Sequence, residues 1–258
     1  MKAKKTLWTI GIFIAAAALL VAAIILIQEA YYMKRVKPIG KIAVTTSVTA
    51  HAGAMDTQPN TYDSIRTGME LIGGGSIEVD VRYDAGGVPV LSHDRVRDGE
   101  AQALPLEDLF SLAAIHSARM NLDLKEHDRS LAPVLELAEK YGLRERIFFT
   151  GLEWPQIHLA RELDVPFYVN ISPCRLWEKY SAAAIRRMVA RAKAEGALGL
   201  NMNYRHATAT LVQMAHEAGL EVSVWTVDKE KAQRRMLALG VDNITTRKPD
   251  VALALLEV

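Results

Sequence analysis

The sequence predicts an α/β fold, a (β/α)8 barrel of the TIM type, preceded by one N-terminal transmembrane helix. Two observations predict it. After about residue 41, short apolar runs alternate eight times with helix-like segments, and one uncharged run, residues 7–27, precedes them. Such a barrel usually takes ~250 residues, and the chain has 258. We therefore expect residues 1–40 to form a membrane anchor and juxtamembrane segment, and residues 41–258 to form the barrel.

The composition limits the classes of function. Half of the residues are hydrophobic and 24% are charged, which is typical of a globular chain. Lys and Arg number 31 against 30 Asp and Glu, and this near-neutral charge argues against a nucleic-acid-binding protein. The single cysteine, Cys174, excludes an internal disulfide and a cysteine-based metal site. The sequence does not indicate an oligomeric state.

The first element is the apolar run. Its 21 residues span roughly 30 Å as a helix, the thickness of the hydrocarbon core of a bilayer. Trp8 lies at its start and Tyr31 and Tyr32 follow it, and these residue types favour the two membrane interfaces. No clean signal-peptidase site follows, so we expect an uncleaved single-pass anchor; a cleaved signal and a buried soluble helix are the alternatives. Basic residues flank both sides, and the short leader favours an extracytoplasmic barrel.

The remaining elements alternate along the chain. Eight strands are predicted at residues 42–49, 76–82, 119–125, 146–150, 166–172, 198–203, 221–227 and 243–246. Helices are predicted at residues 61–71, 106–114, 131–141, 154–163, 182–195, 207–218, 229–239 and 249–257. The alternation favours parallel strands with helices outside, closed into a barrel. An open doubly wound sheet is the alternative arrangement of the same elements.

Charged side chains occupy one face of two of these strands. In residues 76–82, alternation places Ile77, Val79 and Val81 on one face and Glu78, Asp80 and Arg82 on the other. Asn121, Asp123 and Lys125 repeat this pattern on the next strand of the barrel. The apolar faces should meet the helices, so three carboxylates and two cations point into the barrel.

Two interpretations explain this buried charge. One is an ion-pair network of the carboxylates with Arg82 and Lys125. The other is a site for a hard divalent cation, because Glu78, Asp80 and Asp123 offer oxygen ligands and no spaced pair of His or Cys accompanies them. We favour the cation. Both Mg²⁺ and Ca²⁺ take such ligands, and the sequence does not choose between them.

Two histidines come at the ends of strand-like segments. His51 follows the first predicted strand, and His93 follows the run Gly87–Ser92. Both should face the rim where barrel enzymes carry their chemistry. Beside a carboxylate cluster, two such histidines make a plausible general base and general acid.

The residues in this arrangement resemble the glycerophosphodiester phosphodiesterase family. The matching segments, in order, are His51-Ala52-Gly53, Asn60-Thr61, Glu78-Val79-Asp80, His93-Asp94, Asp123-Leu124-Lys125, Trp225-Thr226-Val227-Asp228, Gly240-Val241-Asp242 and Thr246-Arg247-Lys248-Pro249. They cover about residues 49–250, nearly everything after the apolar run. The stretch from Glu78 to Asp94 is the most specific part of the resemblance.

The resemblance implies a metal-dependent hydrolase that cleaves a glycerophosphodiester into an alcohol and glycerol phosphate. It implies that Glu78, Asp80 and Asp123 hold the cation. It further implies that His51 and His93 transfer protons, and we expect His51 to be the starting base. The expected contacts to a small phosphodiester or lipid head group are Lys125, Arg82 and Trp225. The alternatives are a phospholipase acting on intact membrane lipid and a non-catalytic, membrane-tethered ligand-binding barrel.

The chain also departs from the family pattern. Ala52 stands where the family has a phosphate-binding Arg, and Arg247 replaces an Asp near the C-terminus. Asp123 replaces a Glu, which keeps the charge and shortens the reach by one methylene. Arg82 or Arg247 is expected to supply the missing guanidinium. Family members often carry an inserted subdomain after the His-Asp; its absence here predicts an open rim.

Overall fold

The computed structural model describes the chain except for residues 1, 34–45, 97–102, 127, 172–177 and 258, and the side chains of residues 2–7, 9, 29, 32 and 33. The start of the first predicted strand, residues 42–45, lies outside the described residues. So do Cys174, the basic residues that follow the apolar run and the side chain of Tyr32.

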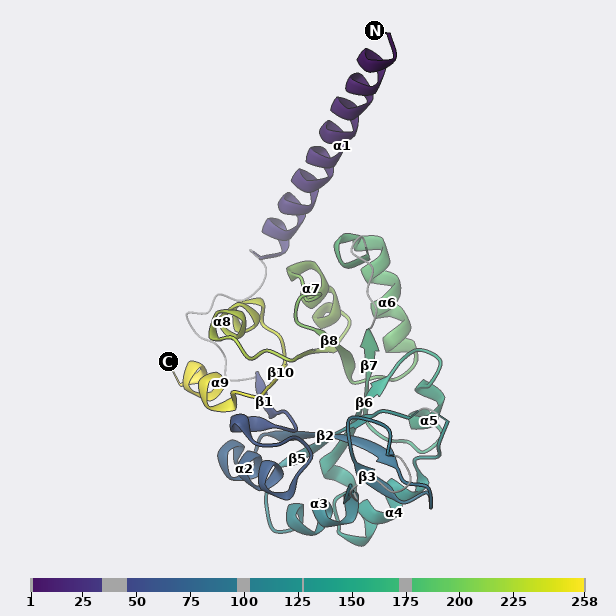
Figure 1. Cartoon of the computed structure of the whole chain (residues 1–258), viewed down its shortest axis with the longest axis vertical. Helices are drawn as coiled ribbons and strands as arrows, with labels where there is room; N and C mark the ends of the chain where they lie inside the picture. The colour runs from purple at the N-terminus through teal and green to yellow at the C-terminus, as the bar shows by residue number, and fades with distance from the viewer. Residues whose placement is uncertain (1, 34–45, 97–102, 127, 172–177, 258) are drawn as a thin grey trace.

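Eight parallel strands close into a barrel, which confirms the predicted fold class (Figure 1). β1 pairs in parallel with both β2 and β10, so the first and last strands complete the ring. The eight are β1 Ser47–Ala50, β2 Ser76–Tyr83, β5 Arg119–Leu124, β6 Ile147–Leu152, β7 Phe167–Ile171, β8 Gly199–Asn203, β9 Glu221–Trp225 and β10 Asn243–Thr246. The open doubly wound sheet is therefore excluded.

A short hairpin extends the end of β2; its first strand falls in the strand-like run that precedes His93, whereas its second strand was not predicted. β3, Pro89–Leu91, runs antiparallel to β2, and β4, Leu104–Pro105, pairs with β3. The turn between β2 and β3 forms because the Asp84 side chain accepts a hydrogen bond from the Val88 N–H (2.8 Å) and Gly87 takes a positive φ of 82°. The two residues of β4 are too few for a periodicity argument to detect.

Helices surround the barrel, as Figure 1 shows. They are α2 Tyr62–Ile72, α3 Leu106–Ala113, α4 Ala132–Lys140, α5 Ile157–Arg161, α6 Ala182–Ala194, α7 Ala209–Glu217, α8 Glu230–Leu239 and α9 Pro249–Leu256, with short 3-10 turns η2 Ala54–Asp56, η3 Arg144–Arg146 and η4 Glu178–Tyr180. Side-chain caps fix several starts: Thr61, Ser181 and Thr208 each accept a hydrogen bond from a backbone N–H three residues on. Each predicted helix is present within three residues of its expected ends.

The apolar core lies between the strands and the helices. On β2, Ile77, Val79 and Val81 are buried on the outer face, while Glu78 and Asp80 project from the inner face. The same alternation on β5 buries Leu122 and Leu124 outward. Burying each such side chain contributes roughly 1.5–3 kcal/mol, and this fixes which face of the strand points inward.

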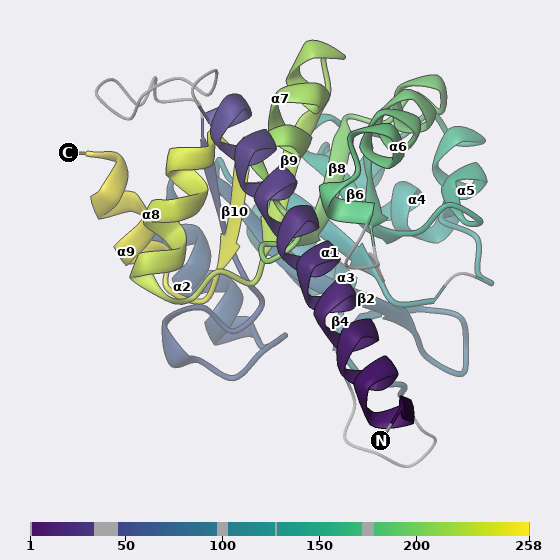
Figure 2. The same cartoon turned by 90° about the horizontal axis from the view of Figure 1, so that it is seen from above.

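α1, Lys2–Met33, projects away from the barrel (Figures 1 and 2). Its segment Ile10–Gln28 has a mean hydropathy of 3.1, and no part of that window is buried against the barrel. This is the one apolar N-terminal helix that the sequence predicted. The end of α1 contacts the barrel through Gln28, whose Nε2 donates to the carbonyl of Tyr180 (3.0 Å) and to Oγ1 of Thr210 (3.2 Å).

Candidate active site

Three carboxylates converge inside the barrel. Glu78 and Asp80 on β2 and Asp123 on β5 place one oxygen each within 4.8 Å of the others. Asp80 and Asp123 are register partners on neighbouring parallel strands, so two like charges lie directly side by side. The period-two alternation therefore brought together the three residues that the sequence predicted as metal ligands.

Lys125 satisfies part of this negative charge. Its Nζ lies 2.8 Å from Asp80 Oδ1 and 2.5 Å from Asp123 Oδ2. Burial alone would lower the pKa of Lys125, but Asp123 and Asp80 outweigh burial and raise it, so the lysine is charged. An ion-pair network thus explains how the charges of Asp80 and Asp123 are compensated in part, because Lys125 pairs with both.

Glu78 is the carboxylate left without a cationic partner among the described residues. Its side chain is 6% exposed and accepts a hydrogen bond from the Ala52 N–H (3.1 Å), while the nearest basic atom, His51 Nδ1, lies 3.8 Å away. Burial, followed by repulsion from Asp80 and Asp123, raises the pKa of Glu78 well above its ordinary value. Three carboxylates against one lysine leave an excess of two negative charges when all are ionised. A divalent cation with oxygen ligands fits this donor set.

Asn60 orients Asp80, and sequence reasoning did not assign it a role. Its Nδ2 donates to Asp80 Oδ2 (2.8 Å), and its Oδ1 accepts from the Asp80 N–H (3.1 Å). Burial raises the pKa of Asp80, but the pair with Lys125 and the Asn60 hydrogen bond bring it below its ordinary value. Asn60 has a φ of 57°, a conformation that Asn tolerates better than most residues, directly before the helix cap Thr61. The Asn60-Thr61 pair, one of the matching segments of the resemblance, was the sequence signal that could have identified Asn60.

Thr150 and Gly151 on β6 lie against Asp123. Thr150 Oγ1 lies 3.0 Å from Asp123 Oδ1. Gly151 has a φ of 81°, and a Cβ there would come within 2.8 Å of the same carboxylate oxygen and 2.3 Å of the Leu124 carbonyl. The β6–β7 register shifts at this point. Only glycine fits here, and nothing in the sequence distinguished it from a turn glycine.

His51 and Trp225 line a small cavity that Glu78 also borders. The cavity has a volume of about 30 Å³, the share of one water in the liquid. His51 Nδ1 and Trp225 Nε1 are both buried and have no hydrogen-bond partner among the described residues. Burial, followed by the charge of Arg247, lowers the pKa of His51 to about 4, so the ring is neutral near pH 7. Two unpaired polar atoms at one cavity indicate a place for a ligand.

His93 lies at the rim, and the structure does not place its ring against the carboxylates. The imidazole is 69% exposed, with Nδ1 3.1 Å from Asp94 Oδ1. Arg82, expected as a substrate contact, instead donates from Nε (3.0 Å) and Nη2 (2.9 Å) to the His93 carbonyl and pairs with Glu126. Arg82 therefore fixes the backbone that carries His93.

Arg247 lies beside His51. β1 and β10 pair in register up to Ala50 and Thr246, and the His51 N–H donates to the Thr246 carbonyl (2.9 Å). By the same alternation, residue 247 shares the inward parity of Asn243 and Thr245. Among the described residues, the guanidinium makes one hydrogen bond, from Nη1 to Asp228 Oδ2 (3.2 Å). Arg247 is thus a cation close to His51. The residue that follows His51, Ala52, is the one that stands where the resemblance led us to expect an arginine.

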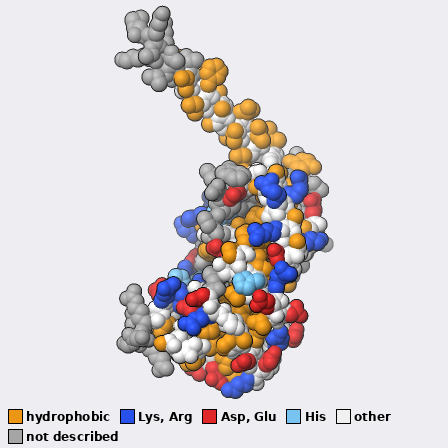
Figure 3. All heavy atoms as spheres, turned by 90° about the vertical axis from the view of Figure 1, so that its right-hand side faces the viewer, with side chains coloured by type: hydrophobic (Ala, Val, Ile, Leu, Met, Phe, Trp, Pro, Cys, Tyr) orange, Lys and Arg blue, Asp and Glu red, His pale blue; other side chains and the backbone are white. Residues whose placement is uncertain are grey.

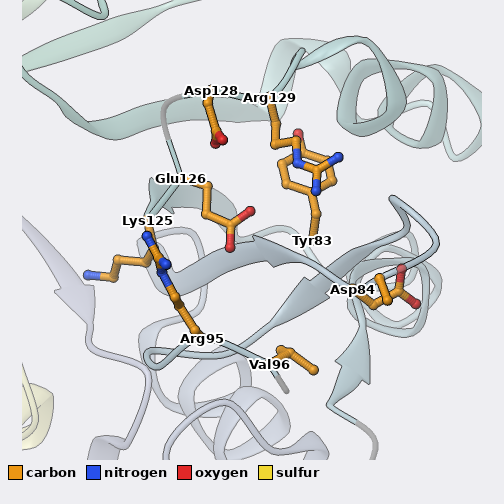
Figure 4. Close-up of a pocket in the computed structure, with 9 residues that line it drawn as sticks. Tyr83, Asp84, Arg95, Val96, Lys125, Glu126, Asp128 and Arg129 are labelled. Atoms are coloured by element: carbon orange, nitrogen blue, oxygen red, sulfur yellow. The ribbon is translucent and has the colours of Figure 1, made fainter. Parts of the chain in front are cut away.

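A larger open pocket of about 570 Å³ adjoins the cluster through Lys125 (Figure 4). It lies between the end of β2, the residues after β3 and the residues after β5. Its charged lining residues are Asp84, Arg95, Lys125, Glu126, Asp128 and Arg129. Figure 4 shows Glu126, Tyr83 and Arg129 facing one another, while Lys125 extends away from them. Three acids and three bases make the pocket polar without a net charge.

Comparison with known sequences identifies a family. The profile of the glycerophosphoryl diester phosphodiesterase family matches residues 116–251, just over half of the chain. A glycerophosphodiester phosphodiesterase of Caldanaerobacter subterraneus subsp. tengcongensis is 24% identical over 240 residues, which are 81% of this chain and 97% of that protein.

Solved structures share the fold. A glycerophosphodiester phosphodiesterase from Parabacteroides distasonis is 22% identical and superposes with a TM-score of 0.67, covering 83% of this chain and 97% of its own. A phosphodiesterase of Oleispira antarctica, solved in complex with the product sn-glycerol-3-phosphate, is 17% identical with a TM-score of 0.69, covering 84% of this chain and 98% of its own.

Proposed function

The chain belongs to the glycerophosphoryl diester phosphodiesterase family and is a phosphoric diester hydrolase, and we propose that it cleaves glycerophosphodiesters with a divalent cation and two histidines. The observation that carries this proposal is the buried carboxylate cluster, whose excess negative charge lies next to a neutral His51 ring with no hydrogen-bond partner for its Nδ1 among the described residues. A purely structural ion-pair network would have a cation for each carboxylate.

Glu78, Asp80 and Asp123 would hold the cation, either Mg²⁺ or Ca²⁺. When bound, such an ion acts as a Lewis acid that offsets the negative charge of the phosphoryl oxygens. Asn60, Thr150 and the Ala52 N–H keep the three carboxylates in place by hydrogen bonds of 2.8–3.1 Å. A prearranged ligand set of this kind loses little entropy on binding.

His51 is proposed as the base. Its neutral ring accepts the proton of the attacking hydroxyl, either of the substrate itself or of water that opens a cyclic product. The buried Glu78, 3.8 Å away, stabilises the imidazolium that forms. His93 is proposed as the acid that protonates the leaving alkoxide from the rim, where Asp94 orients its ring. This step requires the exposed His93 ring to turn toward the bound substrate.

Three side chains are proposed to recognise the substrate. Lys125 contacts a phosphoryl oxygen, and the indole N–H of Trp225 donates from the wall of the small cavity. The guanidinium of Arg247 supplies a forked phosphate contact from beside His51. Arg82 was the other candidate for this guanidinium, but its N–H groups already bind the His93 carbonyl, which favours Arg247. The open pocket beside Lys125 accommodates the alcohol or head group.

α1 is proposed as an uncleaved anchor, with the barrel of residues 41–258 on the extracytoplasmic side. The unbroken apolar segment Ile10–Gln28 supports the anchor. Mass spectrometry of the membrane-bound chain distinguishes the anchor from a cleaved signal, and protease accessibility in sealed vesicles gives its orientation.

Choline release from glycerophosphocholine by the purified full chain in detergent tests the catalytic proposal. We expect turnover that a chelator abolishes and that Mg²⁺ or Ca²⁺ restores. His51→Ala and His93→Ala should each lower kcat by roughly 10²–10⁴-fold. His116→Ala is the matched control, because His116 follows α3 at the opposite end of the barrel.

Each alternative gives a different result in this assay. Turnover that is insensitive to the chelator contradicts the cation. Binding of glycerophosphocholine without turnover supports a tethered ligand-binding barrel. Turnover of intact membrane lipid but not of glycerophosphocholine supports a phospholipase.

A further inference from the structure

The barrel attaches to α1 at the last residue of the apolar span. Gln28 ends the segment Ile10–Gln28, and its side chain contacts the Tyr180 carbonyl (3.0 Å) and Thr210 Oγ1 (3.2 Å). Tyr180 ends η4, which lies between β7 and α6, and Thr210 lies in the first turn of α7, after β8. Both contacts therefore belong to the rim at the carboxyl ends of the strands, the same rim that carries the catalytic residues.

This attachment fixes the depth of the rim. A helix rises about 1.5 Å per residue, so Gln28 lies within one turn of the boundary of the hydrocarbon core that the preceding residues span. We propose that the rim formed by η4 and the β8–α7 loop lies in the head-group layer of the bilayer, and that the active site takes phosphodiesters presented at this lipid surface. The inference rests on the proposed function and on α1 as an anchor.

The side chains at this level are those of a membrane interface. Lys179 lies over the ring of Tyr180 (4.9 Å), and Arg205 lies over the ring of Tyr204 (5.6 Å). Lys179 Nζ also donates to the Arg205 carbonyl (3.2 Å), which joins the two segments into one surface. Aromatic rings favour the head-group region, and basic residues are attracted to anionic lipid head groups.

The charge distribution and the direction of α1 agree with this placement. Figure 3 shows Lys and Arg side chains on the surface just below the end of α1, while Asp and Glu are most frequent at the far end of that face. In Figure 2, the N-terminal end of α1 lies on the side of the barrel toward which β2 and its hairpin extend. The part of α1 that is proposed to span the membrane thus lies on the side onto which the active site opens.

Site-specific labelling of the full chain in vesicles tests the placement. The vesicles contain equal parts of phosphatidylcholine and phosphatidylglycerol, with a quencher on the lipid head groups, and Cys174→Ser provides the background. Fluorophores are attached to Lys179→Cys in η4, which precedes α6, and to Lys193→Cys in the last turn of α6. We expect several-fold stronger quenching at position 179. Equal quenching at both positions overturns the proposal.

Gln28→Leu then tests the consequence for the substrate. This variant keeps α1 apolar but removes both hydrogen bonds to the rim. We expect turnover of a phosphodiester lipid in the same vesicles to fall several-fold, while turnover of soluble glycerophosphocholine stays unchanged. Unchanged lipid turnover, or no lipid turnover in the parent chain, contradicts the proposal. Loss of glycerophosphocholine turnover in the parent chain would instead contradict the proposed function.

Discussion

The barrel interior contains two layers of polar side chains, a lower and an upper one, which differ in whether their polar groups compensate one another. In the lower layer, neutral side chains satisfy one another: Asn243 accepts from Thr49 (2.8 Å) and donates to Ser223 (3.0 Å), and Asn201 donates to Asn170 (2.8 Å). The upper layer holds His51, two residues after Thr49 in the chain, and the carboxylates of β2 and β5, with more negative than positive charge.

This difference separates stability from function. Barrel interiors are usually filled with branched apolar residues, and a neutral polar layer replaces them at little cost when every group is paired. The charged layer is not balanced by the described residues, so it favours a ligand that supplies positive charge. We expect substitutions in the lower layer to change stability and substitutions in the upper layer to change activity.

Glu78→Gln should have the largest effect. The substitution keeps the shape and removes the buried charge without a cationic partner, so activity should fall roughly 10³-fold, since the cation contributes several kcal/mol. In the presence of a chelator the variant should melt a few degrees higher than the parent chain, because repulsion with Asp80 and Asp123 is relieved. Calorimetry with and without Mg²⁺ measures this. A lower melting temperature in chelator would show that Glu78 already has its compensating charge.

Substitutions of Asn60 test whether a residue that orients a carboxylate matters for activity, as the carboxylates of the upper layer do. Loss of its two hydrogen bonds to Asp80 should lower activity by about 10–100-fold. Asn60→Gly and Asn60→Ala remove the same bonds, but alanine at a φ of 57° costs ~1–2 kcal/mol more. Equal activity with unequal stability in the two variants is the expected result. If activity instead followed stability, Asn60 would be a structural residue only.

Arg247→Ala should raise the KM for glycerophosphocholine by about tenfold or more with a smaller change in kcat, because a phosphate contact of the bound substrate is lost. Arg82→Ala should mainly lower kcat, since Arg82 holds the backbone of His93. Arg247→Lys keeps the charge without the fork and should be intermediate. Steady-state kinetics of the three variants decide between the two arginines, and the reverse pattern would assign the phosphate to Arg82.

Asn243→Ala should have the smallest effect on catalysis. It leaves Thr49 and Ser223 without their partner and should cost about 1–3 kcal/mol of unfolding free energy. Activity at saturating substrate should stay within about twofold of the parent chain. Denaturant unfolding and kinetics on the same preparation check both parts. A large loss of kcat would show that the lower layer also contributes to catalysis.

Much of the fold could be predicted because its signals are local. Eight strand and helix pairs follow from the alternation of apolar segments, and caps such as Thr61 fix where helices begin. Strand β4, and with it the hairpin, was missed because β4 has only two residues. Gly151 was missed because the need for glycine there arises from the approach of Leu124 and Asp123, which are far away in the sequence.

The site could be predicted only in part, for a related reason. Glu78, Asp80 and Asp123 were found because two neighbouring parallel strands repeat one pattern. The expected substrate contact of Arg82 and the catalytic role of His93 stay predictions, because the described structure binds Arg82 to a carbonyl and leaves the His93 ring in solvent. Side-chain partners across a rim depend on loop paths, which no periodicity encodes.

The sequence alone determined which side chains face inward, because a strand alternates with period two and its apolar face must meet the helices. It also determined the apolar length of α1, since hydropathy is a property of the residues themselves. Only the tertiary structure decided that Lys125 neutralises two of the three carboxylates, that Arg247 lies beside His51 and that Gln28 joins α1 to the catalytic rim. Each of the last two pairs residues more than 150 positions apart, and barrel closure and helix docking set those distances.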